Sequence, residues 1–225
     1  MKYFSPGFID FFNELSVNNH KEWFHAQKKQ YENSVKQPFQ DFVNALIHEI
    51  QKEEPDLLVE AKDCILRINR DIRFAKDKTP YNLHTTAFVS KGGRKNKSIP
   101  GIFIRFSPKM VGIMGGCFGP DKGQLTSIRQ SIIDHPHALR NLLETPSFQK
   151  KFGAMKGDQM KRVPVLYQAA AEKEPLILHK QYYFMAEEKP ALITSDRLLS
   201  TIMDYYQAMK PVNNYLEQAI QATYS

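Results

Sequence analysis

Apolar side chains recur at helical spacing through the first fifty residues of the chain. Ser5 followed by Pro6 is a typical helix start, and Asn19 with Glu22 three residues later has the form of a capping box. Pro38 is expected to break or kink the helical region. The apolar positions with helical spacing are Phe8, Phe11, Phe12, Leu15, Trp23, Phe24, Tyr31, Phe39, Phe42, Val43, Leu46, Ile47 and Ile50. Such stripes are usually core, so we predict amphipathic helices that bury these side chains.

The pattern changes to alternating or continuous apolar runs after the acidic segment 53–55. Four strand-like runs follow, at residues 63–72, 83–90, 99–106 and 110–118. Their connections are short and rich in turn residues, which favours an antiparallel meander. Gly115 and Gly116, inside the last run, predict a bulge or a close approach of another backbone.

Helical spacing returns after Asp121 and continues to the end of the chain. Ser195 or Asp196 is expected to cap a helix that runs through Met209, and Pro211 is expected to start a last helix. The sequence therefore predicts an α+β fold, with an antiparallel meander sheet in the middle of the chain covered by N-terminal and C-terminal helices. We expect a single domain over residues 1–225: 1–60 helical, 61–118 antiparallel sheet and 119–225 mainly helical.

The chain carries a net charge of +7, and the basic excess lies in its middle. Lys and Arg exceed Asp and Glu by nine in residues 61–117, against a net −4 in residues 1–60 and +2 in residues 118–225. A clustered positive field raises the local concentration of anions. The distribution therefore indicates an anionic partner for the central segment.

Several classes of protein are excluded by what the chain lacks. No apolar run approaches the roughly 20 residues that cross a bilayer, and the N-terminus has no apolar region of a signal peptide. We therefore expect a cytoplasmic protein with no membrane contact. No zinc-ligand, nucleophile-elbow or dinucleotide-loop pattern is found, so neither a metal nor a cofactor is predicted.

Charge is densest in residues 67–81, which we call the central motif. If this segment is a strand, Arg70 lies on its mostly apolar face. An arginine there needs a carboxylate or several carbonyl groups, because an unpaired buried charge is strongly unfavourable. The expected partner is Asp77, or Glu22 or Glu32 from the N-terminal helices. One interpretation of the motif is thus an ion-pair lattice that joins the sheet to the helices.

A second interpretation is an anion site, since guanidinium groups match phosphate and carboxylate groups bidentately. Arg67 and Arg73, with Lys76 or Lys78, would then line a cleft between the sheet and the N-terminal helices. The candidate ligand-binding residues are Arg67, Asp71, Arg73, Lys76, Asp77, Lys78, Tyr81 and His84. The ligand would be an anionic small molecule that bears a phosphate or a carboxylate.

Two further function classes stay open for the same segment. A nucleic acid could contact these cations, although no recognition helix or RNA-binding motif accompanies them. An enzyme would use Asp71 or Asp77 as general base and His84 or Tyr81 as acid, with the arginines stabilising developing charge.

Three parts of the chain also resemble a known family. They are Asn18-Asn19 with Trp23-Phe24, the pattern Arg67-x-x-Arg70-Asp71-x-Arg73-Phe74-x-x-Asp77-Lys78-x-Pro80-Tyr81, and Gly115-Gly116. Together they resemble an uncharacterised, largely bacterial family catalogued only as a domain of unknown function, over nearly the whole chain. This chain has Asn82 where relatives often have lysine, and residues 165–167 where they often have a glycine. The resemblance implies no activity.

Overall fold

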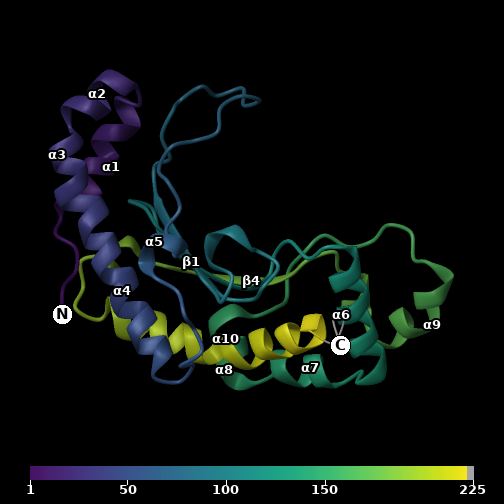
Figure 1. Cartoon of the computed structure of the whole chain (residues 1–225). Helices are drawn as coiled ribbons and strands as arrows, with labels where there is room; N and C mark the ends of the chain where they lie inside the picture. Colours follow the sequence, from purple (N-terminus) through teal and green to yellow (C-terminus); the bar gives the residue numbers. More distant parts are fainter. Residues whose placement is uncertain (222–225) are drawn as a thin grey trace. The chain divides into compact units, whose positions relative to one another are not determined.

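The computed structural model describes residues 1–221 and confirms the predicted α+β class (Figure 1). N-terminal and C-terminal helices flank a four-stranded antiparallel sheet in which neighbours follow chain order. The strands are β1 (Thr85–Val89), β2 (Ile102–Phe106), β3 (Val111–Cys117) and β4 (Tyr182–Glu188). The chain divides into two compact units. Unit 1 is Met1–Arg94, Phe103–Ile113 and Glu187–Met203, and unit 2 is Lys95–Ile102, Met114–Ala186 and Asp204–Ser225.

Unit 1 begins with a helical region that continues past a proline (Figure 1). Its helices are α1 (Gly7–Val17), α2 (Lys21–Ala26), α3 (Lys28–Tyr31), α4 (Gln37–Gln51) and α5 (Ala61–Cys64). The π-helical turn Glu32–Lys36 joins α3 to α4, and the residues on both sides of it keep right-handed helical backbone angles. Of the break or kink predicted at Pro38, the break is therefore absent, because the wider turn just before the proline lets the helix run on.

The core of unit 1 forms where the apolar stripes of its helices meet β2. Phe106 contacts Phe4, Phe39 and Phe42 at ring-centroid distances of 5.7, 5.5 and 5.2 Å. All the predicted core positions in α1 and α4 are buried. Trp23, Phe24 and Tyr31, which were also predicted as core, are only half-buried. Trp23 packs against Phe11 from the short helix α2, none of whose residues is buried.

Three of the four predicted strands are present, and the predicted strand at residues 63–72 is wrong. Residues 61–64 form α5 instead, and the segment after it makes only isolated bridges. Its density of charge opposes burial in a sheet. The fourth strand is β4, which we did not predict although its first residues alternate between buried and half-buried positions.

The glycine pair in β3 lets unit 2 pack closely. A Cβ at Gly115 would lie 2.5 Å from the Phe184 ring, and one at Gly116, where φ is +92°, would lie 2.1 Å from the Tyr182 carbonyl oxygen. The Gly116 N–H donates to the buried Asn213 side chain at 2.8 Å. The predicted close approach of another backbone is confirmed.

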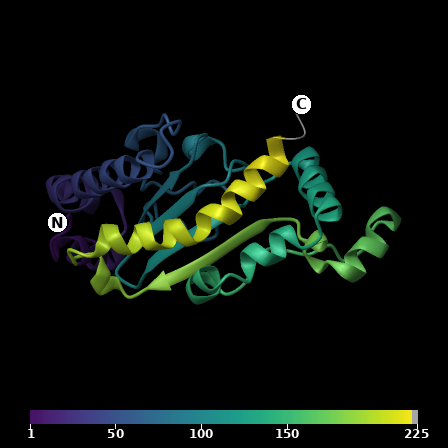
Figure 2. The same ribbon diagram turned by 90° about the horizontal axis from the view of Figure 1, so that it is seen from below.

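The remaining helices of the C-terminal half are α6 (Lys122–Asp134), α7 (Ala138–Leu143), α8 (Pro146–Phe152), α9 (Val165–Lys173) and α10 (Leu198–Gln221). The sequence predicted two helices that meet at Pro211. This prediction is wrong, because α10 runs unbroken through the proline (Figure 2). Buried residues on both sides of the proline, such as Met209 and Val212, keep the helix continuous despite the lost hydrogen bond. None of the helices within residues 1–221 combines the length and apolarity needed to cross a membrane.

Candidate functional site

The central motif forms an extended loop between α5 and β1, which we call the arm (residues 66–82) (Figure 1). Its two sides pair as an irregular antiparallel ribbon. The Leu66 N–H donates to the Thr86 carbonyl at 3.0 Å, and the Arg70 N–H donates to the Pro80 carbonyl at 2.8 Å. An isolated bridge joins Asn69 to Tyr81 between them. The arm is thus ordered by main-chain hydrogen bonds without being a strand of the sheet.

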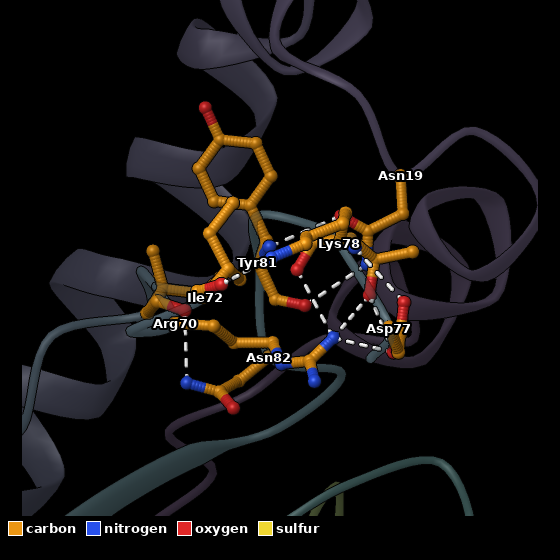
Figure 3. A network of polar contacts seen from close by, with 9 residues as sticks. Asn19, Arg70, Ile72, Asp77, Lys78, Tyr81 and Asn82 are labelled. Atoms are coloured by element: carbon orange, nitrogen blue, oxygen red, sulfur yellow. Dashed lines mark hydrogen bonds and ion pairs between the residues drawn. The ribbon is translucent and has the colours of Figure 1, made fainter. Parts of the chain in front are cut away.

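Tyr81 anchors the base of the arm to the N-terminal helices (Figure 3). The Asn19 side chain donates to the Tyr81 carbonyl at 2.9 Å and accepts from the Tyr81 N–H at 3.1 Å. The Tyr81 ring stacks on Phe24, with centroids 4.0 Å apart and planes 17° from parallel. Asn19 is therefore not the predicted helix cap; His20 Nδ1 accepts from the Trp23 N–H instead. Burial raises the pKa of Tyr81, which makes its hydroxyl a poor acid.

The Arg70 side chain links the two sides of the arm (Figure 3). Its guanidinium donates to the Asp77 carboxylate at 2.6 Å, to the Thr79 carbonyl at 3.0 Å and to the Thr79 hydroxyl. The side chain is 26% exposed, so the predicted pairing with Asp77 is confirmed while full burial is not. The Thr79 N–H, followed by Arg70, lowers the pKa of Asp77 to about 2. Asp77 is accordingly a fixed anion and a poor general base.

The tip of the arm carries a second local ion pair. The Arg73 guanidinium donates two hydrogen bonds to the Asp71 carboxylate, with Nε–Oδ1 and Nη2–Oδ2 distances of 3.0 and 2.7 Å. These hydrogen bonds lower the pKa of Asp71. Lys78 donates to the Ile72 carbonyl at 3.0 Å. Both carboxylates that we considered as bases therefore serve as acceptors for arginine side chains of the arm.

Three cationic side chains of the arm remain open to solvent without a carboxylate partner in the described part of the chain. Arg67, Lys76 and Lys78 are exposed, and none has a carboxylate at ion-pair distance among residues 1–221. Phe74 stands next to Arg73 and is 96% exposed, with the Arg73 guanidinium 6.0 Å from its ring centroid. Sequence reasoning placed Phe74 on an apolar strand face and so missed it as a surface feature.

His84 lies just beyond the arm, before β1, and is half-buried. Burial, assisted by the charge of Arg105, lowers its pKa to about 4. The imidazole is neutral at pH 7 and holds no extra proton to give, so the structure does not equip it as a general acid. Apart from Tyr81 and His84, the predicted site residues thus separate into a set paired within the arm, Asp71, Arg73 and Asp77, and an exposed cationic set, Arg67, Lys76 and Lys78.

The Asn19, Phe24 and Tyr81 contacts join two of the three segments that carry the family resemblance. No curated protein and no solved structure matches the chain. A family model described as "Conserved hypothetical protein (DUF2461)" matches residues 7–215. Because that match covers most of the sequence, the chain belongs to this family of conserved hypothetical proteins.

Proposed function

We propose that the arm binds a single strand of nucleic acid, with Phe74 stacked on a base and the exposed cations Arg67, Lys76 and Lys78 at the phosphates. The observation that carries this proposal is the Phe74 ring, 96% exposed at the end of a basic loop. Aromatic rings stack on any nucleobase, and nearby cations follow the phosphate backbone. The arm presents both kinds of group together.

The charges of the arm support the proposal. The ion pairs of Arg70 with Asp77 and of Arg73 with Asp71 neutralise four side chains. Arg67, Lys76 and Lys78 then supply the net positive charge, and all three are exposed. Arg73 keeps part of its guanidinium surface open as well, since its side chain is 77% exposed.

A strand fits these residues better than a small anion does. A small ligand is usually held in a concave site that removes most of its surface from water. The cations of the arm are instead distributed along an exposed loop whose base is fixed by Asn19 and Phe24. An extended chain of phosphates can contact such a loop at several points at once.

Fluorescence anisotropy with a labelled single-stranded oligonucleotide tests the proposal. Three neutralised phosphates predict a log–log salt slope of about 2 for a single strand. Phe74→Ala should weaken binding about tenfold, in the range expected for one lost base stack. It should leave the melting temperature unchanged because the ring is exposed. Phe74→Trp should restore affinity and show quenching when the strand is added.

The controls separate stacking from charge. Leu58, 85% exposed in the same unit, gives a matched apolar variant, Leu58→Ala, which should bind normally. An abasic oligonucleotide should bind wild type and Phe74→Ala equally, because it offers phosphates without bases. Lys76→Ala should reduce the salt slope, whereas Lys28→Ala, a variant of an exposed lysine on α3, should not.

Two results would refute the proposal. One is equal affinity of wild type and Phe74→Ala for the base-containing strand. The other is a preference for nucleotides, sugar phosphates or anionic vesicles over strands at moderate salt, which would assign the arm to a small anion or to a lipid surface.

A further inference from the structure

A buried arginine in unit 2 has only neutral partners. Arg129 of α6 is 8% exposed. Its Nε donates to the Ile177 carbonyl at 3.0 Å and its Nη2 to the His179 carbonyl at 2.9 Å. The guanidinium carbon lies 5.5 Å from the centroid of the Tyr167 ring. We call Arg129, Tyr167, His179 and Tyr182 the Arg129 cluster.

The positive charge of Arg129 is not balanced locally. No carboxylate lies at ion-pair distance from it within the described range 1–221. The buried acid of this region, Glu174, is engaged by Arg140 at 2.9 Å. Carbonyl dipoles satisfy the N–H groups but leave a full charge in a desolvated position, which is unfavourable without a counter-charge.

Two polar atoms of the Arg129 cluster are shielded from solvent and make no well-formed hydrogen bond in the described part of the chain. They are the Tyr182 hydroxyl and the Nδ1 atom of His179. Tyr182 is fully buried, and its ring centroid lies 5.8 Å from that of His179. Burial raises the pKa of Tyr182, while the charge of Arg129 and its contact with the hydroxyl oppose that rise, so the guanidinium and the hydroxyl face one another.

We propose that the Arg129 cluster is an internal binding site for an oxyanion, a phosphate or carboxylate group, held by the Arg129 guanidinium and the Tyr182 hydroxyl. The anion would neutralise the buried charge and accept a hydrogen bond from the hydroxyl. Arginine suits this role because its planar fork matches two oxygen atoms of such a group. This site is independent of the arm and of its proposed function.

Helix α9 provides the path by which an anion reaches the cluster. Tyr167, whose ring faces Arg129, is its one buried residue within Val165–Lys173. Val165 and Leu166, at the start of the helix, are 84% and 79% exposed. In both ribbon views α9 lies at the edge of unit 2 beside α6 (Figures 1 and 2). Most residues of α9 are exposed, so the helix can move outward and admit a small anion.

Thermal melts of the full chain with inorganic phosphate or acetate, at constant ionic strength against chloride, test the site. We expect a saturable rise in melting temperature with one of the two anions, which also identifies the preferred oxyanion. Tyr182→Phe should require at least about tenfold more anion, as expected for a lost hydrogen bond to a charged group. Without anion its melting temperature should equal or exceed that of wild type, because it removes a buried hydroxyl that makes no well-formed hydrogen bond.

Tyr215 supplies the matched control. Its hydroxyl has a partner, Ser131 Oγ at 3.0 Å, so Tyr215→Phe should lower the melting temperature slightly and leave the anion response unchanged. Hydrogen exchange gives a second readout, since α9 should become protected on anion addition in wild type and not in Tyr182→Phe. The proposal is overturned if neither anion gives a saturable shift. It is equally overturned if Tyr182→Phe behaves like Tyr215→Phe.

Discussion

In the arm, Arg70 and Arg73 find their carboxylates seven and two residues away in the sequence, at the surface. Arg129 is buried instead, and its acceptors are carbonyl groups 48 and 50 residues away. The arm therefore makes its ion pairs locally and in water, where each contributes little to stability. The Arg129 cluster depends on the tertiary fold of unit 2 and lacks a counter-charge. The dense charge motif thus forms ion pairs at the protein surface. The buried charge without a counter-charge belongs instead to Arg129, a single arginine outside the motif.

A large effect is expected where the backbone of unit 2 approaches the Arg129 cluster. A Cβ at Gly157, where φ is +143°, would lie 2.1 Å from the Gln181 carbonyl oxygen and 3.1 Å from His179 Nδ1. Gly157→Ala should lower the free energy of unfolding by about 3 kcal/mol or more, since both strain and a backbone clash oppose it. Urea denaturation measures this change.

Gly153 is the matched control for that variant. Its φ is also positive, at +72°, but a Cβ added there would meet nothing within 4 Å. Gly153→Ala should therefore lower the free energy of unfolding by only about 1–2 kcal/mol, the strain alone. Equal losses in the two variants would show that the close approach at Gly157 does not support the cluster.

Replacing one arginine in each region compares the Arg129 cluster directly with the arm. Arg129→Ala removes two hydrogen bonds and leaves buried carbonyl groups unpaired, so it should destabilise by about 3–5 kcal/mol. Arg70→Ala should cost about 1–2 kcal/mol, because Asp77 remains solvated at 60% exposure. Paired denaturation curves measure both, and a larger loss for Arg70→Ala would reverse the comparison.

Sequence reasoning worked where interactions are local or periodic. The apolar stripes of α1 and α4, the three strands from β1 to β3 and the pairing of Arg70 with Asp77 all follow from spacing along the chain. The strand predicted at residues 63–72 failed because alternation was counted without weighing the charge of the segment. Phe74 was placed on the mostly apolar face of that strand for the same reason, although its ring is 96% exposed.

Other features depend on contacts that no local pattern records. Asn19 looks like a helix cap, but it holds Tyr81, 62 residues away. The partners of Arg129 are backbone carbonyl groups, which every residue has, so sequence composition cannot indicate them. The strand β4 pairs with β3 although a long helical segment separates them in the chain.

The titration of His84 gives a prediction of intermediate size. Its folded pKa of about 4 lies below the ordinary value of 6.5, chiefly through burial. Protonation therefore favours the unfolded state, and the stability from neutral His84 is present above pH 6.5 and is lost as the pH falls to 4. We expect a loss of about 1–2 kcal/mol over this window, moderated by solvent screening. Denaturation at pH 7 and pH 4 should show a smaller difference in His84→Gln, and an NMR pKa near 6.5 would contradict the prediction.

The smallest effect is expected in the arm, at Asp77. Its pKa of about 2 lies below the usual 3.8, because the Thr79 N–H and then Arg70 stabilise the carboxylate. The unfolded chain therefore binds a proton first, and the stability from ionised Asp77 is present above about pH 4 and is lost as the pH falls toward 2. Asp77→Asn should flatten the acid limb of the stability profile only in this window, below the His84 transition. A carboxyl NMR titration of Asp77 near 3.8 in the folded protein would show instead that Arg70 and Thr79 do not hold the carboxylate, and that the arm lacks the local pairing that distinguishes it from the Arg129 cluster.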